Sequence, residues 1–195
     1  MALEYINRRG DRYYVLQGKT KTGKPKYYCS KKPGQFPVDR LPEDFELHEN
    51  PANGLVSVRK VRPSLILPFE RESLANWAAE LAATDMVMVE VEGDSLVVYA
   101  SDTDPDNAIR TMQMLLGPMG DQGDSHRDWI VRHSSYSPCF RFSLTEEDER
   151  LYSAERWCYR GSMDGWHMLA EDQPLDLLAR LYLPHLGQES YFDLM

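Results

Sequence analysis

The first 62 residues alternate between short apolar runs and turn-forming stretches, a pattern typical of β-hairpins. Aromatic runs at 13–16 and 27–29 flank a loop that is rich in glycine and lysine and ends in proline. Alternating runs at 45–49 and 55–58 flank a second group of turn formers. We therefore predict a small β module over 1–62, which can bury little core by itself.

Beyond this module the apolar residues follow a helical period. Counted from Leu74 they recur at i, i+3, i+4, i+7 and i+8, which predicts a helix over 70–84 with one apolar face. Two alternating segments, 86–92 and 95–100, then surround Gly93-Asp94, a pair that favours a two-residue hairpin turn.

A second helix is predicted after Asp104, which can cap it, with Pro105 in its first position and Gly117-Pro118 at its end. The apolar face of this helix consists of Ala108, Ile109, Met112, Leu115 and Leu116. The segment 117–124 is rich in glycine and aspartate and indicates a loop.

Two further hairpins are predicted in the C-terminal part. Segment 129–133 reads as a strand because of its Trp-Ile-Val run, and we pair it with 139–144. Segments 156–159 and 166–169 pair across Asp164-Gly165, another favoured turn.

Two helices complete the chain. Thr145–Asp148 resembles a capping box and predicts a short acidic helix to about Tyr152. A last helix runs from Pro174 until Pro184 ends it. The closely spaced hairpins favour antiparallel pairing. We predict an α+β fold in which helices pack on one face of a mainly antiparallel sheet over 63–195, preceded by the β module of 1–62.

Charge divides the 195 residues in a second way. The whole chain has a formal net charge of −9. Residues 1–32 hold nine lysines and arginines against two acids, whereas residues 64–195 hold nine arginines, no lysine and 24 acids. A basic arm on an acidic body suggests an anionic partner for the arm, or charge pairing within the molecule or across a dimer.

Composition excludes several classes of protein. Hydrophobic residues make up 42% of the chain, but none of their runs is long enough to cross a membrane, and the opening residues lack a secretory signal. Cys29, Cys139 and Cys158 are too scattered for a disulfide framework or a zinc site. We expect a cytoplasmic protein with reduced thiols, no cofactor, no bound metal and no membrane partner.

Three short motifs suggest chemistry, and each is incomplete. Gly18-Lys19-Thr20 resembles the end of a phosphate loop, but Tyr13 stands where that loop needs its first glycine. Asp102, Asp104 and Asp106 have calcium-loop spacing without the glycine and glutamate that such a loop requires.

The third motif is the set Cys158, Asp164 and His167, which contains the three groups of a nucleophilic site. On a tight hairpin Cys158 and His167 would lie too far apart for direct contact. An aromatic core around a buried thiol is the simpler reading.

The basic N-terminal hairpin is the best functional candidate. It interleaves cationic and aromatic side chains, as surfaces that hold single-stranded nucleic acid do, whereas exposed strand lysines can also serve only to prevent aggregation. The candidate binding residues are Arg12, Tyr14, Lys19, Lys21, Lys24, Lys26 and Tyr28.

Two stretches of the chain resemble an uncharacterised family of bacterial hypothetical proteins with no assigned activity. They are Arg8–Tyr14 with Gly18–Tyr28 near the beginning, and the ending His185–Met195. The resemblance covers well under half of the chain, and it implies no catalytic residue, cofactor or partner.

Three hypotheses follow. The first is a non-catalytic module that binds a macromolecule, most simply a protein, through the basic hairpin. The second is a nucleic-acid-associated protein that uses the same hairpin. The third is a small hydrolase or transferase with a site near residues 121–133, where Asp121, Asp124, His126 and His133 could converge around a loop.

Overall fold

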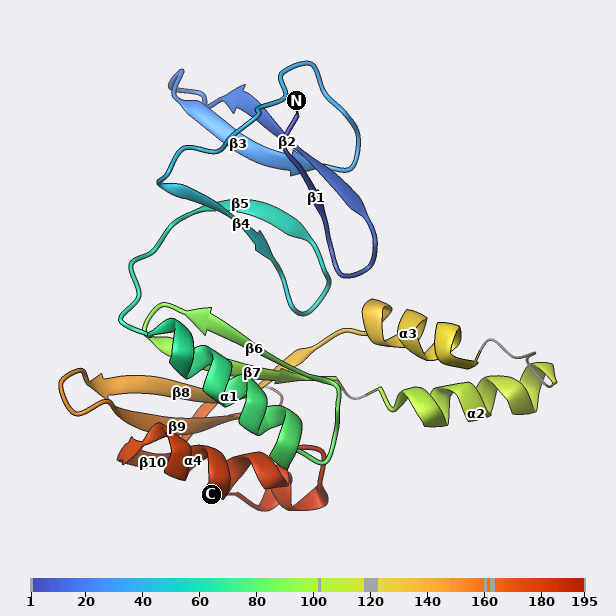
Figure 1. Ribbon diagram of the computed structural model, residues 1–195, viewed down its shortest axis with the longest axis vertical. Helices are drawn as coiled ribbons and strands as arrows, with labels where there is room; N and C mark the ends of the chain where they lie inside the picture. Colours follow the sequence, from blue (N-terminus) through green and yellow to red (C-terminus); the bar gives the residue numbers. More distant parts are fainter. Residues whose placement is uncertain (1, 102, 118–122, 160, 162–163, 195) are drawn as a thin grey trace. The chain divides into compact units, whose positions relative to one another are not determined.

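The computed structural model describes residues 2–101, 103–117, 123–159, 161 and 164–194, except for the side chains of residues 123 and 124 (Figure 1). Its antiparallel sheets and four α-helices confirm the predicted α+β class. The chain forms two compact units, of which the first combines residues 1–62 with 105–135. The second combines residues 63–104 with 136–195. The predicted division shares the break after Arg62 and differs over residues 105–135.

The first unit contains both predicted N-terminal hairpins. A three-stranded antiparallel sheet has the order β1-β2-β3, and a separate hairpin joins β4 to β5. The strands are β1 (Glu4–Ile6), β2 (Arg12–Lys19), β3 (Pro25–Ser30), β4 (Phe45–Glu49) and β5 (Val56–Lys60).

A small apolar core forms beside β2. Val15 is fully buried, and Leu16 is nearly so because the segment that contains Gly34 and Pro37 passes over it. A side chain at Gly34 would come within 2.6 Å of a Leu16 methyl, so this close approach requires glycine. The Tyr27 ring of β3 meets Phe45 of β4 edge-on at 5.1 Å between ring centroids.

Two helices, α2 (Pro105–Leu116) and α3 (Gly123–His133), belong to the same unit, and an ion pair of 3.5 Å joins Arg127 to Asp106. The first begins at Pro105 as predicted. Its predicted apolar face does not form a core, because Met112, Leu115 and Leu116 are exposed.

Helix α3 corrects a prediction, because residues 129–133 were expected to form a strand. The Trp-Ile-Val run favours a strand locally, but contacts one helical turn apart prevail. The His133 ring stacks on Trp129 at 4.3 Å, and its Nδ1 lies 2.8 Å from the Trp129 carbonyl. Ser134 donates a hydrogen bond to the carbonyl of Ile130, which is the buried residue of the run.

The second unit is built on a five-stranded antiparallel sheet with the order β10-β9-β8-β7-β6. The strands are β6 (Val87–Glu92), β7 (Ser95–Ala100), β8 (Ser137–Glu146), β9 (Leu151–Cys158) and β10 (Gly165–Pro174). The predicted Gly93-Asp94 turn is confirmed, since Glu92 pairs with Ser95 and Gly93 adopts a φ of +62°.

Helices cover one face of this sheet, as predicted. Helix α1 (Pro68–Leu81) and helix α4 (Leu175–Tyr182) lie side by side on it, and the chain ends in the short 3₁₀ helices η2 (Leu183–His185) and η3 (Glu189–Asp193) (Figure 1). The core between the helices and the sheet includes Leu74, Ala78, Val89, Leu96, Val98, Phe140, Phe142, Ala154 and Leu178.

Two local predictions are wrong in this unit. Residues 145–152 form no helix but the end of the β8–β9 hairpin, in which Glu146 pairs with Leu151. Strand pairing and the burial of Tyr152 outweigh the capping pattern. The segment 139–144 belongs to β8, which pairs with β7 and β9 rather than with 129–133.

The last hairpin is confirmed with a different turn. Trp157 of β9 pairs with Trp166 of β10, as expected from the predicted segments. Gly165 is not a turn residue, because it pairs with Cys158 inside the ladder. The connection between the two strands is therefore longer than the predicted two-residue turn.

Candidate functional site

The β2–β3 hairpin forms a self-contained basic loop. Thr20 closes it, because its amide donates to the Lys24 carbonyl at 2.8 Å and its hydroxyl accepts from the Lys24 amide at 3.1 Å. Gly23 adopts a φ of +80°, which the tight turn requires. The backbone groups of Thr20 and Lys24 are therefore used to close the loop, and the lysine side chains extend into solvent.

The hairpin lysines lack a counter-ion among the residues that the structure describes. Lys19, Lys21, Lys24 and Lys26 are exposed, and none of the carboxylates that the structure describes forms an ion pair with them. The two neighbouring cations differ, since Arg12 pairs with Glu4 at 2.9 Å and Lys31 with Asp11 at 2.7 Å. No acidic residue occurs between Arg12 and Val38.

Strand register sorts the candidate residues onto two faces. Leu16 pairs with Tyr28 and Gly18 with Lys26, so Tyr28 and Lys26 lie on the face that also carries Arg12 and Tyr14. Lys19, which pairs with Pro25, lies on the opposite face. Lys21 and Lys24 lie in the connecting loop. The structure therefore brings together four of the seven candidates and places the other three at the hairpin tip.

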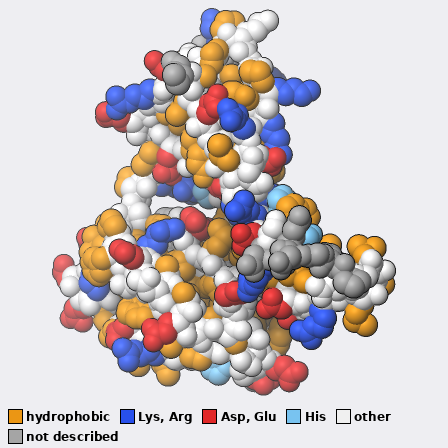
Figure 2. Space-filling view, turned by 45° about the vertical axis from the view of Figure 1, so that its right-hand side comes forward, with side chains coloured by type: hydrophobic (Ala, Val, Ile, Leu, Met, Phe, Trp, Pro, Cys, Tyr) orange, Lys and Arg blue, Asp and Glu red, His pale blue; other side chains and the backbone are white. Residues whose placement is uncertain are grey.

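Tyr28 is the most accessible aromatic group of this face. Its ring lies against Gly18, where a β-carbon would come within 3.3 Å of it, and 42% of the residue is exposed. Tyr14 is half-buried, while Tyr13 and Tyr27 of the opposite face are used in packing. The upper part of Figure 2, which β1–β5 form, shows Lys and Arg side chains projecting from the surface.

The structure does not complete the other motifs that the sequence suggested. Gly18-Lys19-Thr20 ends a strand rather than beginning a helix, so it lacks the helix N-terminus of a phosphate loop. Asp102 lies outside the described residues. No group of three metal-binding side chains occurs within the described part of the chain. In the β9–β10 ladder Cys158 pairs with Gly165, whereas His167 pairs with Arg156.

The described residues of the region 121–133 do not form a recognisable catalytic site. Asp121 lies outside the described residues, and the side chain of Asp124 is not described either. The His133 ring is engaged with Trp129 on its own helix. The third hypothesis, a hydrolase or transferase, therefore stays a prediction.

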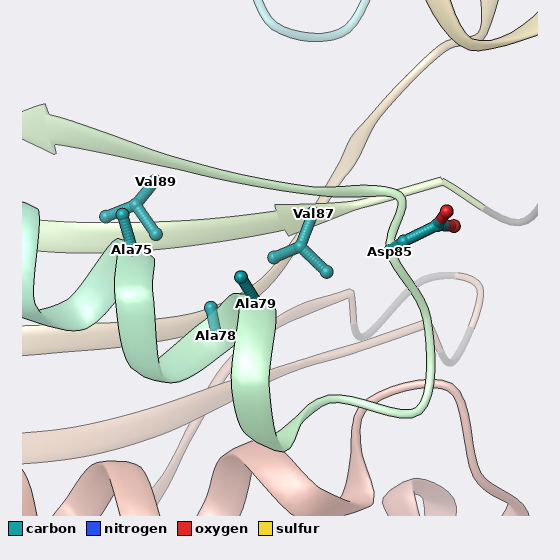
Figure 3. A pocket seen from close by; sticks show the side chains of 6 residues that line it. All are labelled: Ala75, Ala78, Ala79, Asp85, Val87 and Val89. Atoms are coloured by element: carbon teal, nitrogen blue, oxygen red, sulfur yellow. The ribbon is translucent and has the colours of Figure 1, made fainter.

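A pocket of about 110 Å³ lies between α1 and β6 (Figure 3). Figure 3 shows that alanines of the helix face valines of the strand, with the only carboxylate at one end. The lining residues are Ala75, Ala78, Ala79, Asp85, Val87 and Val89. Such a lining offers no acid–base pair and no nucleophile.

The structure contains a second pocket that the sequence analysis did not predict. It lies between β9 and η3, again has a volume of about 110 Å³, and contains the buried Arg156. The sequence does contain an indication of a buried arginine. Arg156 follows Tyr152 and Ala154 at alternate positions of β9, so all three side chains lie on the same, inward face of the strand. A charged residue at a core position is an exception that needs a reason.

Comparisons were made with family models, curated proteins and solved structures. Within the described residues, no helix is long and apolar enough to cross a membrane. No family model matches the chain, and the searches of curated proteins and of solved structures returned no match either. The resemblance of the two terminal stretches to bacterial hypothetical proteins therefore stays a prediction.

Proposed function

We propose that this protein is a non-catalytic binding protein and that its basic hairpin contacts an acidic protein surface. The contact residues would be Arg12, Tyr14, Lys19, Lys21, Lys24, Lys26 and Tyr28. The observation that supports this proposal is that four exposed hairpin lysines lack any ion pair with the described carboxylates.

Electrostatics favours an acidic partner for this hairpin. Clustered ammonium groups repel one another, and an opposing row of carboxylates relieves that repulsion and steers the encounter. A second copy of the chain offers such a surface, since residues 64–195 contain 24 acids against nine arginines. Because the lysines are exposed, salt weakens the attraction over about 10 Å at 0.1 M.

Single-stranded nucleic acid is a second candidate because of one specific observation. Tyr28 exposes 42% of its surface on the same face as Lys26, and stacking on an aromatic ring beside a cation is how such strands are held. This candidate requires the tyrosine, whereas binding to an acidic protein requires chiefly the lysines.

The experiment measures binding of the full chain to labelled poly-L-glutamate, a model of an acidic protein surface. A variant with Lys19, Lys21, Lys24 and Lys26 changed to glutamine is expected to bind at least about tenfold more weakly. The control removes four other positive charges of the same unit, at Lys31, Lys32, Arg40 and Lys60, and is expected to lose less than about threefold.

The outcomes separate the two candidates. Equal losses in the hairpin variant and the control would reduce the effect to net charge and refute the hairpin as the contact surface. A single-stranded oligonucleotide serves as the competing probe. If it binds more tightly than poly-L-glutamate and Tyr28→Ala abolishes that binding, the second candidate replaces the first.

A further inference from the structure

Arg156 is a buried cation to which the described part of the chain supplies no carboxylate. It lies in β9 with 4% of its surface exposed, on the sheet face that points toward the helices. The other two arginines of this sheet region have partners, because Arg141 pairs with Glu155 and Arg150 pairs with Glu70. Within the described residues Arg156 forms no ion pair.

The contacts that the structure describes for Arg156 include no anionic group. One guanidinium nitrogen, Nη2, donates to the Phe192 carbonyl at 3.4 Å, and Nε is buried with no hydrogen-bond partner. The guanidinium also lies 5.7 Å from the ring centroid of Tyr191. Burial raises the pKa of the Tyr191 phenol, whose O–H lies 3.0 Å from the carbonyl oxygens of both Cys139 and Trp157 and donates a hydrogen bond shared between them. Tyr191 is therefore neutral and supplies no counter-charge.

A guanidinium cannot escape this situation by losing its proton, because arginine keeps its charge in proteins. A buried charge is costly unless it is paired. An oxyanion of a ligand would pair it and could form two parallel hydrogen bonds to the fork of the side chain.

The pocket beside Arg156 has room for such a ligand. Its volume is about 110 Å³, which is well above the roughly 10–15 Å³ that one water molecule needs on this measure. The pocket is lined by Arg156, Trp157, Cys158, Tyr159, Tyr191 and Phe192. Tyr159 and Phe192 are exposed, so the pocket opens to solvent. The indole of Trp157 packs edge-on against Trp166 on the sheet face opposite to Arg156, so it is not a donor for a ligand of Arg156.

We infer that this pocket binds a small carboxylate that carries one negative charge and a short apolar chain. One buried cation is neutralised by one anion, and the unpartnered Nε–H of Arg156 requires an acceptor oxygen. The aromatic lining favours an apolar remainder over the second charge of a phosphate. The carboxylate belongs either to a free small acid or to the C-terminus of a peptide, which share this chemistry.

The test uses the ¹⁵N-labelled full chain and follows the Arg156 Nε–H signal and the backbone amide signals of the lining residues Cys158 and Tyr159 by NMR. Sodium acetate and sodium propionate are expected to shift these signals saturably, whereas sodium chloride at equal ionic strength does not. Inorganic phosphate is expected to bind at least tenfold more weakly. A short peptide and its C-terminally amidated form separate the two sources, because only a chain-end site prefers the free peptide to propionate.

Two variants provide the controls. Arg156→Met keeps an unbranched, shorter side chain and removes the charge, and it is expected to abolish the carboxylate-dependent shifts of the Cys158 and Tyr159 amides. Arg180→Met removes an exposed charge of α4 and is expected to leave the affinity within twofold. Without carboxylate, Arg156→Met is also expected to raise Tm, because it relieves an unpaired buried charge.

Four results would overturn the inference. They are the absence of a saturable shift in the unmodified chain, phosphate binding as tight as propionate binding, amide shifts of Cys158 and Tyr159 that persist in Arg156→Met, and an equal loss of affinity in Arg180→Met. If Arg156→Met does not fold, the titrations of the unmodified chain decide alone.

Discussion

Phe140→Ala is expected to lower the free energy of unfolding by about 4 kcal/mol, the middle of the range for removing a buried phenylalanine. Phe140 is fully buried in the centre of the five-stranded sheet. Its ring contacts Phe142, Tyr182 and Tyr191, with centroid distances of 6.3, 6.3 and 5.3 Å. Alanine leaves a cavity among three rings from separate elements, which cannot collapse together. Urea unfolding followed by circular dichroism measures the loss.

The control for this prediction is Leu181→Ala. Leu181 lies on α4 and is half exposed, so its removal is expected to cost less than about 1 kcal/mol. A comparable loss in the two variants would contradict the placement of the core between the sheet and its helices.

The second large effect is expected at Glu70. Its carboxylate is buried, accepts the Leu67 amide at 2.8 Å and Arg150 Nε at 2.9 Å, and so ties the start of α1 to the β8–β9 turn. Glu70→Ala leaves the partly buried Arg150 guanidinium unpaired, and we expect a loss of about 3 kcal/mol. The exposed Glu72 of the same helix is the matched control, and Glu72→Ala is expected to change stability by less than about 0.5 kcal/mol.

The pH dependence follows from the same pair. Burial alone would raise the pKa of Glu70, but the hydrogen bonds from Arg150 and the Leu67 amide outweigh it, so the pKa lies below 4.5. A lowered pKa in the folded state stabilises the protein above the unfolded-state pKa, and this contribution disappears as pH falls through the folded-state value. The stability difference between the unmodified chain and Glu70→Gln should therefore shrink in acid. A constant difference from pH 7 to pH 3 would refute this account.

Local signals were sufficient to predict much of the fold. The hairpins of the N-terminal module, helix α1 and the Gly93-Asp94 turn depend on short-range periodicity and turn chemistry, which a sequence displays directly. The start of α2 was predictable for the same reason, since Asp104-Pro105 combines two N-terminal signals.

The failures occurred where local and distant interactions disagree. Residues 129–131 favour a strand by composition, yet the stacking of His133 on Trp129 and the burial of Ile130 stabilise a helix. Residues 145–148 resemble a helix start, but the distant Glu70 binds Arg150 and the β8–β9 ladder continues through the segment. Neither segment contains a local sequence pattern that identifies the residues with which it interacts in the fold.

The candidate sites were predictable to different degrees. The basic hairpin is visible in the sequence because its four lysines lie close together between positions 19 and 26. Only the register shows that Lys19 lies on the opposite face from Tyr28. The Arg156 pocket combines β9 with a C-terminal 3₁₀ helix about 35 residues later, so its composition depends on tertiary structure. The alternation along β9 could have indicated an inward arginine but not its lack of a partner.

The proposal of a binding surface depends on the hairpin lysines being free in solution, and competitive acetylation of the full chain measures this directly. Lys31 is the internal reference, because its hydrogen bond to Asp11 raises its pKa and keeps the amine protonated and unreactive. Mass spectrometry is expected to show faster acetylation at Lys19, Lys21, Lys24 and Lys26 than at Lys31. If the four hairpin lysines react as slowly as Lys31, carboxylates of the protein already occupy them, and the hairpin is not available to a partner.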